Sequence, residues 1–124
     1  MKNYDKNKKM NYEIVRTDDF DREVKRLSKK YRSFLDDLED FKNELLENPT
    51  MGDNLGNNVR KVRMAITSKG KGKSGGARVI TCNVLVNFDN AEIYLLTIYD
   101  KNEQQNISKE EIARLRAING IVDN

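Results

Sequence analysis

The stretch Glu92-Ile-Tyr-Leu-Leu-Thr-Ile-Tyr99 is a near-continuous run of apolar, β-branched and aromatic residues. Such residues favour strands, and a strand that is apolar on both sides is typically covered on both faces. We therefore expect these residues to form the central strand of a sheet. Asp89-Asn90 is a turn immediately before it, so residues 77–87 are predicted to form the neighbouring strand.

Apolar and polar side chains alternate along residues 59–67, which is the period-2 pattern of a half-buried strand. The apolar members on one face are Val62, Met64 and Ile66. Lys61, Arg63 and Thr67 lie on the other face. The pattern therefore predicts that two cations share one side of the sheet.

A helical hairpin is predicted between a short strand at residues 12–16 and the remaining strands. Thr17 and the acidic pair that follows it are typical of a helix start. A second helix is expected after Ser33, with the serine as its cap, and it ends at Asn48-Pro49. The apolar positions that recur at helical spacing are Phe20, Val24, Leu27 and Tyr31 in the first helix and Leu35, Leu38, Phe41 and Leu45 in the second.

Ser108-Lys-Glu-Glu111 is a capping-box pattern that opens a last helix. The resulting order β-α-α-β-β-β-α predicts an α+β domain, with a small antiparallel sheet, an N-terminal helical hairpin and a C-terminal helix. A chain of 124 residues is long enough for one domain. We expect that domain at residues 12–124, preceded by a polar extension at residues 1–11.

The composition restricts location and chemistry. With 35% charged residues and no stretch of ~18 apolar residues, the chain is predicted to be soluble and to have no membrane span. The basic N-terminus is not followed by the apolar core of a secretory signal, so we expect a cytoplasmic protein. Cys82 is the single cysteine and is expected to be buried. The absence of histidine excludes a Ser-His-Asp triad, a histidine zinc site and imidazole acid–base catalysis.

Between Asp53 and Asp89 the sequence has no carboxylate. Residues 54–88 carry a charge of +7, whereas the other residues hold 16 basic against 20 acidic side chains. A basic surface of this kind favours polyanions, chiefly nucleic acid, although a solvated lysine loop is the alternative explanation. The seven cations, which flank or belong to the glycine-rich run Lys69-Gly-Lys-Gly-Lys-Ser-Gly-Gly76, are Arg60, Lys61, Arg63, Lys69, Lys71, Lys73 and Arg78.

Three segments in this order resemble the RelE/ParE superfamily of toxins, and among its members the HigB-like branch. They are RKVRMA at residues 60–65, GKGKSGGARVI at 70–80 and EIYLLTIYDKNEQQNIS at 92–108. The resemblance covers residues 12–118. It implies the toxin of a bacterial type II toxin–antitoxin pair and, for RelE-like members, an endoribonuclease (an mRNA interferase) that cuts mRNA in the ribosomal A site.

The same resemblance implies a cognate antitoxin, expected to be a helix-turn-helix protein, as partner, and contact with operator DNA only through that antitoxin. Messenger RNA and the ribosome are the other implied partners, and no cofactor or metal is expected. Cleavage without metal has the ribose 2′-OH attack the adjacent phosphorus, which requires a proton acceptor, a group that stabilises the phosphorane, and a proton donor for the leaving oxygen. Lysine or tyrosine can accept the proton only if its pKa falls, and crowding by like charges acts in that direction.

The resemblance also implies roles for single residues. Lys61 and Arg63 match the paired basic residues of the family, and Arg78 matches the arginine that opens the next strand. Arg78 is expected at the scissile phosphate, with Lys61 and Arg63 as phosphate stabilisers, one of which is a candidate proton acceptor. Tyr99 and Lys101 complete the catalytic candidates, although Tyr99 could instead stack on a base. The residues expected to contact the RNA or ribosome backbone are Arg60, Lys69, Lys71 and Lys73.

Other functions are consistent with some of the same residues. ParE-like members of the superfamily inhibit DNA gyrase by binding and do not cut RNA, so gyrase inhibition remains the main alternative. A remnant that only binds its partner is a third possibility. A nucleotide-binding P-loop is disfavoured, because Thr67 stands where its first glycine belongs and a strand follows the glycines.

Overall fold

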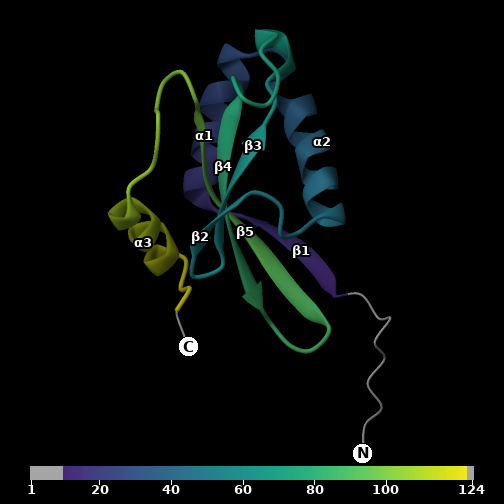
Figure 1. Ribbon diagram of the computed structural model, residues 1–124, viewed down its shortest axis with the longest axis vertical. Coiled ribbons are helices and arrows are strands. Elements are labelled where there is room, and N and C mark those ends of the chain that lie inside the picture. Colours follow the sequence, from purple (N-terminus) through teal and green to yellow (C-terminus); the bar gives the residue numbers. More distant parts are fainter. Residues whose placement is uncertain (1–9, 123–124) are drawn as a thin grey trace, which may run out of the picture.

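Five strands form one sheet in the order β1-β5-β4-β3-β2 within residues 10–122, the part of the chain that the computed structural model describes (Figure 1). The N-terminal extension expected at residues 1–11 lies outside the described residues except at its end, where Asn11 already belongs to the first strand. The strands are β1 (Asn11–Arg16), β2 (Asp53–Gly56), β3 (Val59–Met64), β4 (Ala77–Leu85) and β5 (Asn90–Asp100). The helices are α1 (Asp18–Lys30), α2 (Phe34–Glu47), the short 3₁₀ helix η1 (Thr67–Lys69) and α3 (Lys109–Ile118).

The predicted α+β class, with a helical hairpin before the sheet and a helix after it, is confirmed. The sheet itself is mixed, because β1 pairs with β5 in parallel while the β2–β3, β3–β4 and β4–β5 pairs are antiparallel. The expectation of an antiparallel sheet was wrong for this one pair. Parallel neighbours need a long crossover connection, and the chain between β1 and β5 supplies it with the hairpin and three strands.

The strand β2 was not predicted, because its four residues are all exposed and carry no alternating apolar pattern. The strand predicted at residues 59–67 ends at Met64, and Thr67 begins η1 instead. Asp37 of α2 fixes this turn, since its carboxylate accepts hydrogen bonds from the backbone N–H of Thr67 (2.8 Å) and from the Thr67 hydroxyl.

The hairpin starts as predicted at Thr17, whose hydroxyl accepts the Phe20 N–H (3.2 Å) and donates to the Leu95 carbonyl (2.8 Å). Ser33 occupies the N-cap position of α2 as expected, but its hydroxyl donates to the Asp37 carboxylate and accepts no N–H of the first turn. Leu35 was also placed wrongly in the core stripe, since it is 60% exposed. The buried apolar stripe of α2 begins at Phe34, one residue before Leu35. It consists of Phe34, Leu38, Phe41 and Leu45.

Two apolar cores lie on opposite faces of the sheet. The larger core is formed by α1 and α2 against one face, and the smaller core by α3 against the other. Residues of β5 contribute to both cores, which confirms that this strand is interior and covered on both faces, although β4 is the middle strand of the five. Cys82 is buried in the smaller core as expected. No helix within residues 10–122 is both long and apolar enough to cross a membrane.

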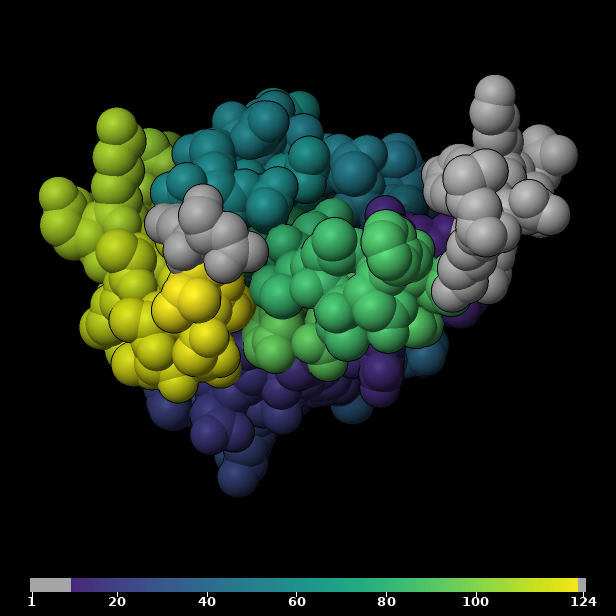
Figure 2. All heavy atoms as spheres, turned by 90° about the horizontal axis from the view of Figure 1, so that it is seen from below, coloured from purple at the N-terminus to yellow at the C-terminus, as the bar shows by residue number. Residues whose placement is uncertain are grey.

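The two ends of the sheet have different surfaces. The connection between β3 and β4 lies at the upper end of the view in Figure 1, and the connection between β4 and β5 lies at the lower end. Figure 2 views the molecule from below, where the β4–β5 connection (green) is at the surface. Val86 and Phe88 of this connection are exposed, and so is Leu85 at the end of β4. The candidate functional residues gather at the other end.

Candidate functional site

Arg63, Arg78 and Tyr99 form a row across three neighbouring strands. Arg63 on β3 is the register partner of Arg78 on β4, and Arg78 is the register partner of Tyr99 on β5. Side chains that are directly opposite each other in antiparallel strands lie on the same face of the sheet. Lys61 belongs to this face too, because it lies two residues from Arg63 on the same strand. The fold thus brings four of the predicted catalytic residues to one face.

A β-bulge places Tyr99 in this row. The register of β4 with β5 shifts after Ile80, which leaves Leu96 as an extra residue on β5. One extra residue moves every later side chain to the opposite face. Tyr99 therefore packs in the smaller core with Leu96, whereas Leu95 packs in the larger core. Without the bulge Tyr99 would lie under the helical hairpin, away from Arg78.

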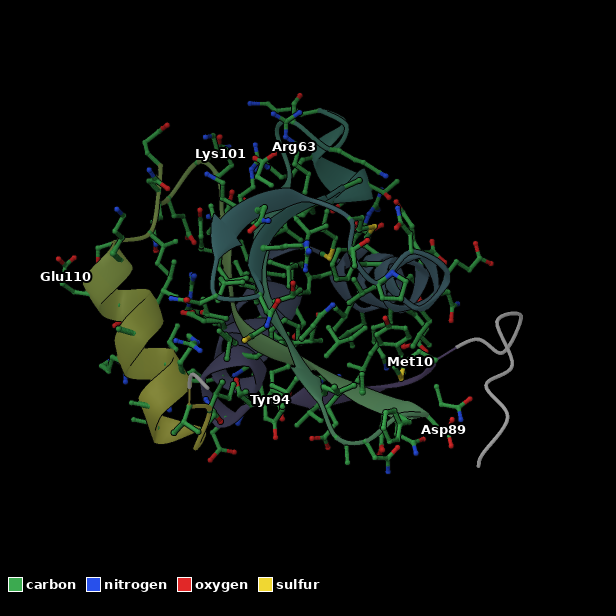
Figure 3. The ribbon with its side chains drawn as sticks, turned by 60° about the horizontal axis from the view of Figure 1, so that its bottom comes forward. Met10, Arg63, Asp89, Tyr94, Lys101 and Glu110 are labelled. Carbon is green, nitrogen blue, oxygen red and sulfur yellow. The ribbon has the colours of Figure 1, made fainter. Side chains whose placement is uncertain are left out.

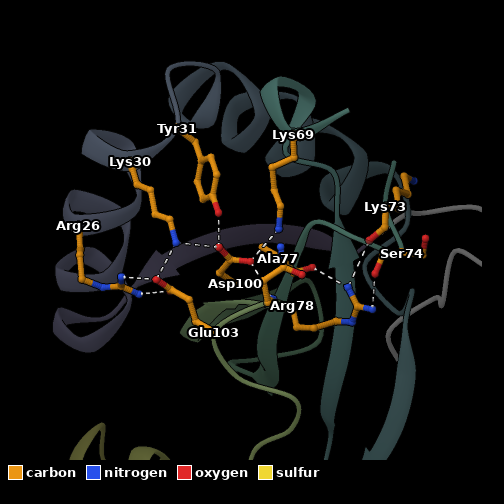
Figure 4. Close-up of polar contacts among 11 residues, drawn as sticks. Arg26, Lys30, Tyr31, Lys69, Lys73, Ser74, Ala77, Arg78, Asp100 and Glu103 are labelled. Atoms are coloured by element: carbon orange, nitrogen blue, oxygen red, sulfur yellow. Dashed lines mark hydrogen bonds and ion pairs between the residues drawn. The ribbon is translucent and has the colours of Figure 1, made fainter. Parts of the chain in front are cut away.

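Arg78 lies beneath the glycine-rich loop, which we define as residues 70–76. The arginine is 6% exposed. Its Nη1 donates to the carbonyls of Lys73 (3.2 Å) and Ala77 (3.1 Å), and its Nη2 donates to the carbonyl of Ser74 (3.0 Å), as Figure 4 shows. A guanidinium has five N–H donors, so these bonds fix its orientation and still leave donors for an anion.

Gly76 connects the loop to β4 in a position that only glycine can occupy. A Cβ atom on Gly76 would lie 2.1 Å from the Met64 carbonyl oxygen, which belongs to the backbone of β3. The Gly76 carbonyl also accepts the backbone N–H of Lys101 (3.0 Å). The C-terminal end of the loop is therefore held between the ends of β3 and β5.

Tyr99 is 5% exposed, and within residues 10–122 its buried hydroxyl has no hydrogen-bond partner. It lines a cleft between α1 and α3, together with Arg22 and Leu115. Burial raises the pKa of the Tyr99 hydroxyl, and the charge of Arg78 offsets this only in part. The hydroxyl consequently keeps its proton at neutral pH and can act as a donor. The ring and the hydroxyl are both covered, so stacking on a base and proton donation to RNA each require the surrounding side chains to move.

Three of the predicted cations, one of them in the row, are accessible. Arg63 and Lys71 are exposed and Lys61 is half-buried, and within the described residues none of the three makes an ion pair or a side-chain hydrogen bond. Lys101 is half-buried just beyond the end of β5, with its Nζ 3.4 Å from the carbonyl of Gln105. Figure 3 shows Arg63 and Lys101 at the same margin of the sheet. These residues can meet a phosphate without rearrangement of the fold.

Residues 54–88 have no carboxylate in their sequence, but carboxylates from other parts of the chain lie beside them in the fold. The Nζ of Lys69 lies 2.8 Å from the carboxylate of Asp100, and the Nζ of Lys73 lies 2.9 Å from that of Glu44. Asp53 on β2 is the register partner of Lys61. The premise that only like charges crowd the predicted site was therefore wrong. Acids distant in sequence balance part of the charge.

Two of the predicted RNA-contacting residues lie away from the row. The side chain of Lys69 is 5% exposed and is paired with Asp100, so its charge is not available to RNA. Arg60 lies on the opposite face of β3 from Lys61, because side chains alternate along a strand. Lys71 and Lys73 remain exposed on the glycine-rich loop.

Asp100 is the main residue that the sequence analysis missed. It is fully buried, and its carboxylate accepts hydrogen bonds from Lys69, from the Tyr31 hydroxyl and from the backbone N–H of Asn102 (3.0 Å), with the Nζ of Lys30 at 3.6 Å. Burial by itself would raise the pKa of this carboxyl, but the hydrogen bonds from Lys69, Tyr31 and Asn102 outweigh it and lower the pKa to about 2. The sequence feature that could have identified Asp100 is its position as an acid directly after the apolar run of β5.

The network continues to the surface at Glu103. Its carboxylate binds Arg26 (2.8 Å) and Lys30 (2.9 Å) of α1, and Figure 4 shows both pairs beside Asp100. Hydrogen bonds from these two residues lower the pKa of the Glu103 carboxyl to about 2. No group of three or more carboxylate or cysteine side chains within residues 10–122 is arranged to hold a metal ion.

Comparison with known protein families gives a match over most of the chain. The model of the family described as RelE toxin of the RelE/RelB toxin–antitoxin system matches residues 12–124. The matched region contains the row of Arg63, Arg78 and Tyr99 together with the glycine-rich loop. The HigB-like branch stays a prediction.

Proposed function

Because the chain belongs to the RelE toxin family and is a toxin of a toxin–antitoxin system, we propose that it is an endoribonuclease that cleaves mRNA on the ribosome. Its target would be in the cytoplasm. Its antitoxin, proposed to be a helix-turn-helix protein, would carry any contact with operator DNA.

The observation that carries this proposal is the register pair of Arg63 and Arg78. Like charges directly opposite each other across two strands destabilise a sheet. A phosphate that binds between the two guanidinium groups removes this repulsion, and arginine can hold it with two parallel hydrogen bonds. The pair is therefore better explained as an anion site than as a packing contact.

The proposed reaction uses the row and its neighbours. The Lys61 amine accepts the proton of the ribose 2′-OH, whose oxygen then forms a bond to phosphorus. Arg63 and Arg78 stabilise the extra negative charge of the phosphorane. The bond from phosphorus to the 5′-oxygen breaks, and the Tyr99 hydroxyl donates a proton to that oxygen. The products are a 2′,3′-cyclic phosphate and a free 5′-OH. Lys101, two residues beyond Tyr99, is the alternative proton donor.

The glycine-rich loop supplies binding rather than chemistry in this proposal. Lys71 is exposed and Lys73 forms an exposed ion pair with Glu44. Exposed ion pairs contribute only about 0–1 kcal/mol, so an RNA phosphate can displace Glu44 at low cost. Each lysine is proposed to contact the RNA backbone.

The test is cleavage of mRNA by the purified toxin on translating ribosomes, mapped by primer extension. Fragments that end in a 2′,3′-cyclic phosphate and begin with a 5′-OH are expected. The rate should not follow the identity of the divalent ion when one ion that keeps the ribosome assembled replaces another. A gyrase supercoiling assay runs in parallel. Inhibition of gyrase with no RNA cleavage would reject the proposal in favour of the ParE-like alternative.

A further inference from the structure

We propose that Asp100 is a positioning residue for Arg78, which it reaches through Lys69 and the glycine-rich loop. The inference rests on the proposed ribonuclease function for its effect on rate, but its structural part can be tested without RNA. The Asp100 side chain is fully buried. Its carboxylate binds Lys69, Tyr31 and the backbone of Asn102, and not a side chain of the row.

Asp100 joins three separate elements at one carboxylate. Tyr31 is the C-terminal cap residue of α1, Lys69 is the last residue of η1, and Asp100 is the last residue of β5. The Tyr31 hydroxyl and the Lys69 Nζ both bind the carboxylate, and the Lys69 Nζ also lies 5.5 Å from the centroid of the Tyr31 ring (Figure 4). Lys69 is therefore held from two sides.

The glycine-rich loop begins directly after this anchored lysine. Gly70 and Gly72 have φ values of 70° and 64°, a left-handed conformation that glycine adopts without strain. Glycines do not restrict a loop to one shape, so the shape depends on what holds the two ends. The Lys69–Asp100 pair holds the beginning, and the packing of Gly76 against Met64 holds the end.

The held loop in turn orients Arg78. Two of the three carbonyls that accept from its guanidinium, those of Lys73 and Ser74, belong to the middle of the loop. Strand pairing links Asp100 to Arg78 by a second route, because Asp100 on β5 is the register partner of Ala77, the residue before Arg78. The acid that anchors the start of the loop thus lies one residue along β5 from the partner of Arg78.

A buried ion pair contributes little net stability. Desolvation of two charges can cancel their attraction, and apolar residues of similar size often stabilise a fold as well or better. Directional bonds, however, fix an element in one geometry, which an apolar contact does not. We therefore attribute the Lys69–Asp100 pair to the geometry of the loop and of Arg78.

The test compares Asp100→Asn with Glu103→Gln, the matched control. Both variants convert an acid to its amide within one network, but Glu103 binds only α1 residues at the surface and leaves Lys69 paired. Three quantities are measured for each: the rate of limited trypsin cleavage after Lys71 or Lys73, and kcat and KM for RNA cleavage. The side-chain Nε–H signal of Arg78 in NMR spectra reports its orientation directly.

For Asp100→Asn we expect loop cleavage by trypsin to become at least about tenfold faster, since the loop opens locally. We expect kcat to fall at least about tenfold, since small misplacement of a catalytic group costs up to about 10²-fold, with KM changing much less. The Arg78 Nε–H signal should shift. Glu103→Gln should stay within about twofold of the parent in trypsin rate, kcat and KM, and should leave the Arg78 Nε–H signal unshifted.

The outcomes separate the two proposals. If the parent toxin does not cleave RNA, the proposed function fails, while the trypsin rate and the Arg78 signal still decide whether Asp100 positions the loop. A folded Asp100→Asn protein with a protected loop, or with an opened loop and an unchanged kcat, would overturn the inference. So would loss of kcat with the loop and the Arg78 signal unchanged.

Lys69 provides a second route should Asp100→Asn fail to fold. Lys69→Met removes the ion pair but leaves Asp100 its bonds to Tyr31 and Asn102, and we expect the same faster loop cleavage and lower kcat. Lys69→Arg keeps the charge beside Asp100 and should restore both values toward the parent. Equal behaviour of the two variants would show that the ion pair does not position the loop.

Discussion

Arg63 and Arg78 are register partners on adjacent strands, but their surroundings differ. Arg63 is exposed and, within the described residues, makes no ion pair or side-chain hydrogen bond, whereas Arg78 is buried and donates to three carbonyls. The pair therefore combines an exposed cation without a partner among the described residues and a buried cation held by three hydrogen bonds. The difference predicts distinct effects when each is replaced.

Arg63→Ala should reduce RNA cleavage by about 10²–10³-fold, the typical loss when one donor to a transition-state oxyanion is removed. Arg60→Ala is the matched control, because Arg60 lies on the opposite face of the same strand. It should cleave within about twofold of the parent. Cleavage is measured as kcat/KM on one mRNA. Equal losses in the two variants would mean that cleavage depends on the total positive charge and not on the face of β3 that carries it.

Arg78→Lys should lose both activity and some stability. A lysine keeps the charge but cannot make the same fixed set of bonds to the loop carbonyls. We expect cleavage to fall at least about 10²-fold. The free energy of unfolding should fall by about 1–3 kcal/mol, the usual cost of buried polar groups that lose a partner. Urea unfolding and single-turnover cleavage measure the two effects. A variant that cleaves at the parental rate contradicts the role of Arg78.

Lys69 and Lys71 are two residues apart and should behave oppositely. Lys69→Gln removes one partner of a buried ion pair, which typically costs about 3–5 kcal/mol of stability. Lys71→Gln changes an exposed side chain and should alter stability by less than about 0.5 kcal/mol. Instead it should weaken RNA binding and reduce its dependence on salt by about one phosphate contact. Filter binding at several salt concentrations, together with thermal unfolding, distinguishes the two.

Acid should destabilise the fold through Asp100. Its pKa in the folded state is about 2, below its ordinary 3.8, so the unfolded state takes up the proton first as pH falls. The contribution is complete above about pH 4 and is lost between about pH 4 and pH 2, and it amounts to about 2 kcal/mol. Urea midpoints measured across this range should fall less steeply for Asp100→Asn than for the parent. Parallel curves would show that Asp100 does not titrate as described.

The cleavage rate should rise from pH 6 to pH 9. The proposed acceptor is an amine, and amines hold their proton more tightly than an imidazole does. The proposed donor Tyr99 should not limit the rate in this range, because burial raises the pKa of its hydroxyl. Single-turnover rates on one RNA at constant ionic strength measure the profile. A maximum near neutral pH with a decline above it would contradict these assignments.

The sequence determined most elements of this protein, with β2 and η1 as the exceptions. Helical spacing and caps located the hairpin and the last helix, and the apolar run of residues 92–99 located the central strand. These features are local, so a single sequence contains them. Family resemblance added the row candidates Lys61, Arg63, Arg78 and Tyr99, which the strand register does bring to one face.

The tertiary structure alone decided the charge balance of the site and the face of the sheet on which Tyr99 lies. The bulge at Leu96, which turns Tyr99 toward Arg78, depends on how two strands pair. The partner of Lys69 is Asp100, 31 residues further along the chain. The glycine-rich loop, whose own sequence has no carboxylate, is therefore anchored by a carboxylate from β5. Charge and hydrogen bonding act through space, and the distances that govern them exist only after the chain has folded.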